Sequence, residues 1–165
     1  MSGTRAGRVG IVVGSRSDIA AAEKAAAVLD ELGVASETRV ISAHRAPDLL
    51  AGFVASAEER GIGVFIAIAG LAAHLPGVVA SQTTLPVIGV PMAGGISDGL
   101  DALLAIVQMP KGVPVATVGV GNGENAGLLA AQILALGDAG LAERVAARRA
   151  EQARAIAADP ANEGL

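Results

Sequence analysis

Short apolar runs rich in Val and Ile alternate along this chain with longer stretches in which apolar residues recur at helical spacing. The apolar runs lie at 8–13, 34–40, 64–69, 86–90 and 113–118, and the helical stretches lie at 18–32, 47–60, 75–81, 99–107 and 124–136. This alternation predicts a parallel sheet with helices on both faces, because each helix returns the chain to the same end of the sheet. The predicted fold class is therefore α/β, with a five-stranded parallel sheet.

A sixth helix is predicted at about 139–158, and no strand follows it. Residues 1–165 suit a single domain, with its core at about 8–137. The last helix either caps its own sheet or reaches over a neighbouring subunit. Because 52% of the residues are apolar, a large fraction for so short a chain, the second arrangement is favoured.

Composition argues against several classes of function. The chain has no cysteine, which rules out thiol nucleophiles, cysteine metal sites and disulfides, and a cytoplasmic location is expected. A net charge of −4 with only 12 Lys and Arg residues argues against nucleic-acid binding. The first apolar run is short and ends in polar residues, so neither a signal peptide nor a membrane-spanning segment is expected.

Polar residues follow the first predicted strand, at the edge where parallel sheets bind ligands. The segment is Gly14-Ser15-Arg16-Ser17-Asp18. Its hydroxyl and backbone N–H groups suit a phosphate or another anion, and Asp18 could accept hydrogen bonds from a ribose. The alternative is an ordinary Ser/Asp helix N-cap.

Both histidines of the chain also follow predicted strands. Ser42-Ala43-His44-Arg45 comes after the second strand, where Arg45 could bind a phosphate and His44 could exchange a proton near neutral pH. His74 follows the third strand, among small apolar residues. Two histidines at one edge of a sheet indicate a proton-transfer site.

Non-catalytic interpretations of the two histidines stay open at this point. His44 and Arg45 could be a surface pair in a helix-start loop, and His74 could be a structural histidine. A metal site built from both histidines and Asp18 has weak support, because no acidic residue stands at close helical spacing to either histidine.

Four separated segments carry a resemblance to a known family. They are Gly14-Ser15-Arg16-Ser17-Asp18, Ser42-Ala43-His44-Arg45-Ala46-Pro47-Asp48, Ala72-Ala73-His74-Leu75-Pro76-Gly77 and Gln108-Met109-Pro110-Lys111-Gly112-Val113-Pro114-Val115-Ala116-Thr117. In order and spacing they resemble the PurE family, the class I N5-carboxyaminoimidazole ribonucleotide mutases of purine biosynthesis. The resemblance implies a three-layer flavodoxin-like fold, a homo-octamer, and no metal, ATP or organic cofactor.

The resemblance also implies a reaction and a role for each motif residue. The carboxylate of N5-carboxyaminoimidazole ribonucleotide would move from the exocyclic nitrogen to ring carbon C4, with His44 as general acid and base. The implied residues at the 5′-phosphate are Ser17, Ser42 and Arg45, and Asp18 is implied at the ribose. Around the base and carboxylate the implied residues are Ser15, Gly70, Ala72, His74 and Leu75. Ala43 is also an implied substrate-binding residue. Of these, His74 would orient the carboxylate. The unstable substrate could be handed over by N5-carboxyaminoimidazole ribonucleotide synthetase.

Two other interpretations remain. The chain could be a class II enzyme, which carboxylates aminoimidazole ribonucleotide directly with carbon dioxide, although the segments around His74 and Met109 look like class I. It could also be a non-catalytic nucleotide-binding module on the same fold, because a fold alone does not fix a function. The sequence departs from the family pattern at Leu71, where a second glycine is common, and between Met92 and Ala102.

Overall fold

The computed structural model describes residues 7–164, which include the whole of the first apolar run. The strands of its sheet are β1 (Arg8–Val13), β2 (Ser36–Val40), β3 (Ile62–Ala69), β4 (Val87–Pro91) and β5 (Ala116–Thr117). They run parallel, in the order β2-β1-β3-β4-β5. This is the strand order of flavodoxin-like folds, so the predicted fold class is confirmed.

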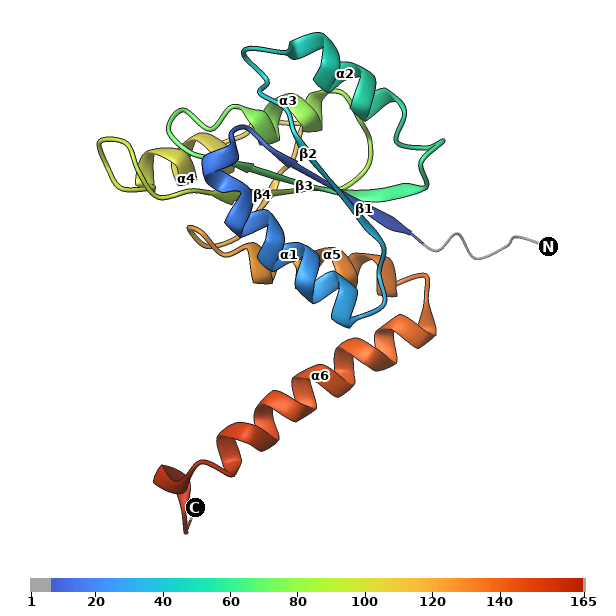
Figure 1. Ribbon diagram of the computed structural model, residues 1–165, viewed down its shortest axis with the longest axis vertical. Coiled ribbons are helices and arrows are strands. Elements are labelled where there is room, and N and C mark those ends of the chain that lie inside the picture. Colours follow the sequence, from blue (N-terminus) through green and yellow to red (C-terminus); the bar gives the residue numbers. More distant parts are fainter. Residues whose placement is uncertain (1–6, 165) are drawn as a thin grey trace, which may run out of the picture.

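Helices cover both faces of the sheet, as the alternation in the sequence predicts. One face carries α1 (Ile19–Glu31) and α5 (Gly123–Ala135), and the other carries α2 (Pro47–Ala55), α3 (Leu75–Ser81) and α4 (Leu100–Val107) (Figure 1). Short 3-10 turns, η1 (Arg16–Asp18) and η2 (Pro160–Asn162), precede α1 and follow α6 (Ala139–Ala157). Throughout residues 7–164, every helix is too short or too polar to cross a bilayer.

The central strands divide the interior into two apolar cores. On β1, Ile11 and Val13 pack in the core under α1 and α5, whereas Val12 packs in the core under α2, α3 and α4. On β3, Ile66 and Phe65 divide in the same way. Because helices cover both faces, the side chains of a central strand are buried on both sides, which explains the unbroken apolar runs in the sequence.

The last strand is shorter than the sequence predicts. The sequence predicts a strand over 113–118, but the paired residues are only Ala116–Thr117. Gly112, just before the predicted strand, has φ +94° and lies in a turn. Pro114 has no N–H to donate to the hydrogen bonds between strands. Because β5 is an edge strand, a short ladder leaves few buried groups unpaired.

Most helices match their predicted bounds to within a residue. Asp18, predicted as the first residue of the first helix, is the last residue of η1, and α1 begins at Ile19. The second helix ends at Ala55 rather than at residue 60, and turns lead from there to Gly61, which has φ +70°. Local apolar spacing is a poor guide to helix ends, because the end depends on where the backbone can turn.

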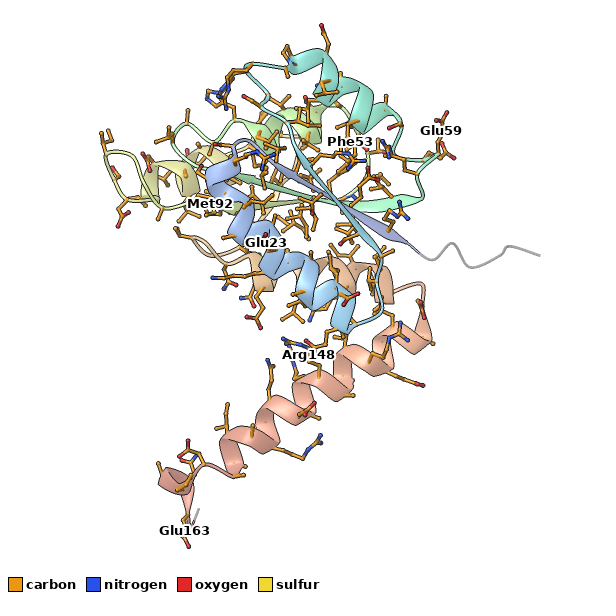
Figure 2. All side chains as sticks on the ribbon, in the orientation of Figure 1. Glu23, Phe53, Glu59, Met92, Arg148 and Glu163 are labelled. Atoms are coloured by element: carbon orange, nitrogen blue, oxygen red, sulfur yellow. The ribbon has the colours of Figure 1, made fainter. Side chains whose placement is uncertain are left out.

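The first half of α6 packs against the body of the domain, and the second half projects from it (Figure 1). Leu141 is buried. Arg148, labelled in Figure 2, makes ion pairs with Glu31 of α1 (3.1 Å) and Glu124 of α5 (3.0 Å). The hydrogen bond to Glu124 raises the pKa of the Arg148 guanidinium above its ordinary value. The helix therefore rests on α1 and α5 and does not cap the sheet, and its contact with a neighbouring subunit stays a prediction.

Helices α1 and α5 pack with their backbones in close contact because α5 presents glycines to α1. A Cβ atom at Gly127 would lie 2.7 Å from the carbonyl oxygen of Ala25, and one at Gly123 would overlap the carbonyl oxygen of Ala21. Backbone atoms cannot move aside as the end of a side chain can. Glycine at these two positions is therefore required for the packing of this layer.

We expect Gly127→Ala to destabilise the protein, although alanine is normally the better helix residue. The added methyl group would press on the backbone of Ala25, and overpacking of this kind costs about 1–3 kcal/mol. Gly52→Ala in α2 is the matched control, because no atom lies within 4 Å of its new Cβ. That control should gain about 0.5–1 kcal/mol. Urea unfolding measures both free energies, and equal effects of the two changes would contradict the close α1–α5 contact.

Candidate active site

The loops that follow β1, β2 and β3 start side by side at one edge of the sheet. Val13, at the end of β1, is paired with both Val40 of β2 and Ile68 of β3. Two hydrogen bonds continue this pairing past the strand ends, from Gly14 N–H to Ile68 O (3.2 Å) and from Ile41 N–H to Val13 O (2.9 Å). The strand register therefore brings together residues that are far apart in sequence.

A cavity of about 650 Å³ lies between these loops. Its lining contains every site residue that the sequence predicts, namely Ser15, Ser17, Asp18, Ser42, Ala43, His44, Arg45, Gly70, Ala72, His74 and Leu75. Gly14, Leu71 and Ala73 also line it and belong to the predicted loops. Sequence reasoning missed Ala69 and Ala93, whose only signals were the end of a strand and a place in a glycine-rich loop.

The first loop arranges its polar side chains around η1. The Ser15 hydroxyl caps this turn by accepting from Ser17 N–H at 3.4 Å, so the N-cap interpretation holds for Ser15. Asp18 makes no capping hydrogen bond for α1 and instead accepts from the Ser17 hydroxyl at 3.0 Å. Two hydroxyl groups and one carboxylate therefore face the cavity together.

The second loop fixes Arg45 against the first loop. The backbone N–H of Arg45 donates to the Ser42 hydroxyl at 3.3 Å, and its guanidinium donates to the carbonyl oxygen of Gly14 at 3.2 Å. Pro47 opens α2 just beyond, as the sequence predicts. A guanidinium has five N–H donors in a planar fork, so an anion beside Ser17 and Ser42 could be bound by Arg45 as well.

The two histidines meet across the cavity. His44 Nε2 lies 2.7 Å from His74 Nδ1, and the two rings stand nearly perpendicular at 88°. Both side chains are exposed to the cavity rather than buried in the core, which argues against a purely structural His74. A hydrogen bond between two imidazole nitrogens holds one proton, so one ring donates and the other accepts. The pair can therefore pass a proton to or from a ligand.

The third loop carries strained backbone. Leu71 and Ala73 have φ +57° and +42°, although neither is glycine. The left-handed region costs a residue with a Cβ atom about 1–2 kcal/mol, and such strain is usually found at functional sites. Gly70 precedes them, where a Cβ atom would lie 3.3 Å from that of Met92. The loop is thus held in a strained backbone conformation against the start of the β4–α4 loop.

Two further features bear on the interpretation of the cavity. Within residues 7–164, no three His, Cys, Asp or Glu side chains lie close enough together to hold a metal ion. A second cavity, of about 660 Å³, lies at the opposite edge of the sheet, beside the segments that precede β3 and β4. Glu58 is the one ionisable residue in its lining, so it lacks the paired acid–base groups of the first cavity.

Comparison with known proteins gives consistent matches over nearly the whole chain. The family model for AIR carboxylase matches residues 8–155. An N5-carboxyaminoimidazole ribonucleotide mutase of Vibrio parahaemolyticus is 52% identical over 155 residues, covering 93% of this chain and 96% of the relative. A mutase of the same name from Methanocaldococcus jannaschii is 58% identical over 135 residues, covering 82% and 83% of the two chains.

A solved structure agrees with these sequence matches. The crystal structure of Treponema denticola PurE superposes with a TM-score of 0.85 at 29% sequence identity, covering 96% of this chain and 99% of that one. The family model includes all three loops of the cavity, and the relatives share about half of their residues with this chain. The chain belongs to the AIR carboxylase family.

Proposed function

We propose that this protein is an N5-carboxyaminoimidazole ribonucleotide mutase, an isomerase of purine biosynthesis. The observation that carries the proposal is the His44–His74 contact of 2.7 Å in a cavity that also holds Arg45 and three serine hydroxyls. Proton-transfer groups and groups that can bind an anion thus line the same cavity. The identity of 52% to a mutase of that name supports the same reaction.

The substrate lies across the three loops in this proposal. Ser17, Ser42 and Arg45 bind the 5′-phosphate, and Asp18 accepts hydrogen bonds from the ribose. The aminoimidazole base reaches toward the histidines, where Ser15, Ala43 and the loop 70–75 surround it. This placement follows the polarity of the lining, because the cation and hydroxyls lie on the β1 and β2 loops and the third loop is mostly small and apolar.

The reaction divides into two proton-coupled halves. In the first half, the carbamate C–N bond breaks, carbon dioxide is released inside the cavity, and the exocyclic nitrogen keeps the electron pair and receives a proton. In the second half, the electron-rich C4 attacks carbon dioxide, a C–C bond forms, and the C4 proton leaves to restore aromaticity. One proton is given and one is taken back, so the isomerisation is balanced.

His44 is the general acid and base of both halves. It gives the proton to the exocyclic nitrogen, and as the neutral imidazole it then takes the proton from C4. His74 holds the His44 ring through the 2.7 Å contact and orients the carboxylate. Because the contact engages Nε2 of His44, Nδ1 of His44 is the nitrogen that is left to face the substrate.

A class II carboxylase is the second candidate function, and a specific relative favours it. The chloroplastic phosphoribosylaminoimidazole carboxylase of Vigna aconitifolia is 50% identical to this chain over 148 residues. The match covers 27% of that protein, whereas the mutases match along most of their length. The mutase function is therefore the better supported of the two.

The exposed apolar face of α4 supports assembly into a larger particle. Leu100, Leu104 and Val107 repeat at spacings of four and three residues, and they keep 54%, 45% and 49% of their surface exposed. Such a stripe on a surface helix usually contacts another subunit. A homo-octamer is the assembly that the family resemblance implies. A cytoplasmic location and transfer of substrate from the synthetase belong to the same proposal.

The first test offers the purified protein two substrates. We expect rapid formation of the C4-carboxylated product from N5-carboxyaminoimidazole ribonucleotide, and slow formation from aminoimidazole ribonucleotide with bicarbonate, both followed by ultraviolet absorbance. His44→Asn should lower kcat by about 10²- to 10⁴-fold, because the proton carrier is lost. It should bind substrate nearly as well as the wild type. Preference for the second substrate would establish the carboxylase. If the protein converted neither substrate, it would be a non-catalytic binding module.

His74→Asn separates orientation from proton transfer. The amide of asparagine can still hydrogen bond to His44 Nε2, so a positioning role should survive in part. We expect a smaller loss of kcat than in His44→Asn and little change in the shape of the pH profile of kcat/KM. If His74→Asn removed one limb of that profile, His74 would be a proton carrier itself.

Leu104→Lys tests the subunit contact. A charge in the centre of the α4 stripe should release smaller species, which light scattering coupled to gel filtration would detect. Leu136→Lys is the control, because Leu136 is 89% exposed and lies outside the stripe. An unchanged mass for Leu104→Lys would contradict assembly through α4.

A further inference from the structure

The second cavity lies at the far ends of the two helices that follow the histidines. Helix α2 begins three residues after His44 and ends at Ala55, and Val54 and Ala55 line the second cavity. Helix α3 begins directly after His74 and ends at Ser81, which lines the same cavity. Each helix therefore has a histidine just before its first turn and the second cavity at its last turn.

Helices α2 and α3 are short and share one apolar core on the same face of the sheet (Figure 1). They have nine and seven residues, which makes them about 10–14 Å long. Leu50 and Val54 of α2 and Leu75 and Val79 of α3 are all buried in this core. Close-packed interiors have low compressibility, so they transmit a displacement rather than absorb it. A displacement of the last turns is therefore carried to the first turns, beside the histidines.

The second cavity has the size and the apolar floor of a small-molecule site. Its volume of about 660 Å³ falls within the range of ligand pockets, about 300–1,000 Å³. Val54, Ala57 and Ile62 line it and are buried, so they form its floor. The apolar part of a ligand would rest on these side chains.

Hydroxyl groups of the lining offer both kinds of hydrogen bond to a ligand. The Ser81 hydroxyl donates to the carbonyl oxygen of Val78 at 2.8 Å, so its oxygen is the part that can accept from a ligand. The Thr83 hydroxyl accepts from Leu85 N–H at 3.1 Å, so its proton is the part that can be donated. A ligand with both donors and acceptors fits this lining.

The charge of the lining disfavours anions. Glu58 contributes a carboxylate, and no Lys, Arg or His lines this cavity among residues 7–164. A phosphate or carboxylate group would therefore meet a like charge without a cation to bind it. The active-site cavity differs in this respect, because Arg45 lines it. The second cavity thus suits an uncharged molecule.

We propose that the second cavity is a regulatory site for a small uncharged molecule, which displaces the contact between His44 and His74 through α2 and α3. The effect on turnover rests on the proposed mutase function. The ligand fills the space between the last turns of the two helices, moves the helices apart and lengthens the 2.7 Å contact between the rings. It does so because it binds the displaced arrangement more tightly than the original one.

The experiment attaches a probe inside the second cavity. The chain has no cysteine, so a single introduced cysteine is the one thiol available for labelling. Thr84→Cys and Ala55→Cys place it in the lining, at positions that are exposed to a reagent. The probe is N-ethylmaleimide, which is small and uncharged. Ala51→Cys is the matched control, because Ala51 is also exposed on α2 but lies outside the lining.

The histidine pair supplies a readout that does not need turnover. The chain has two histidines and no tyrosine, so ultraviolet absorbance during reaction with diethyl pyrocarbonate reports on His44 and His74 alone. A ring nitrogen held in the contact is protected, so lengthening the contact should speed this reaction. For labelled Thr84→Cys and Ala55→Cys we expect histidine modification to rise and kcat to fall, each about tenfold, because a misplacement of about 1 Å can cost about 10²-fold in rate. The unlabelled variants and labelled Ala51→Cys should behave as the wild type.

The charge of the reagent tests the class of ligand. Thr84→Cys is reacted with uncharged methyl methanethiosulfonate and with anionic 2-sulfonatoethyl methanethiosulfonate, and 2-mercaptoethanol serves as the reference thiol. The Glu58 carboxylate should lower the relative rate of the anionic reagent about threefold at low salt. Glu58→Gln, added to Thr84→Cys, should restore it. A relative rate equal to that of the reference thiol in Thr84→Cys would contradict the exclusion of anions.

Three results would overturn the regulatory site. Unchanged histidine modification in both labelled cavity variants would show that the second cavity does not act on the pair. An equal change in labelled Ala51→Cys would show that the effect is not specific to the cavity. A change in particle mass on labelling, measured by light scattering, would make the cavity a subunit contact. Failure of the proposed function is distinct from these, because the wild type would then form no C4-carboxylated product while histidine modification would still respond to the probe.

Discussion

The parallel pairing of β1 between β2 and β3 is the constraint on which the site depends. Val13 is in register with both Val40 and Ile68, so the loops after these three strands begin side by side at the same end of the sheet. Backbone hydrogen bonds set this register, and a shift of one residue would turn each buried side chain to the other face. The core and the cavity are therefore specified together. A change that loosened the register would lose both.

The hydrogen bond between the two histidines concentrates proton chemistry in a cavity that is otherwise poor in ionisable groups. The lining holds one carboxylate and one guanidinium, Asp18 and Arg45, and both belong to the loops that would bind phosphate and ribose. The base end of a nucleotide would therefore meet imidazole nitrogens and small apolar residues. This division suits a reaction that moves protons and an uncharged gas, because stray charges there would admit water.

Much of this arrangement was predictable from the sequence. Strand ends are marked by Gly14, Ser42 and Gly70, and the rule that ligands bind beyond the carboxyl ends of strands placed the polar motifs in one site. The 2.7 Å histidine contact was not predictable, because the relative positions of His44 and His74 depend on β1 lying between their strands. The short β5 and the early end of α2 depend on backbone turns that apolar spacing does not encode.

The strained loop shows how a rigid scaffold makes a costly residue possible. β3 is buried along nearly its whole length, and Met92 N–H donates to Ala69 O at 3.0 Å. The end of β3 is therefore held by the core and by the start of the β4–α4 loop just before the strained loop begins. Gly70 then passes close to Met92, which leaves the next residues little freedom. Leucine at position 71 accepts a conformation that glycine would adopt freely, and the stability of the buried sheet offsets that strain. The buried core therefore holds the loop beside the cavity in a conformation that the loop alone would not adopt.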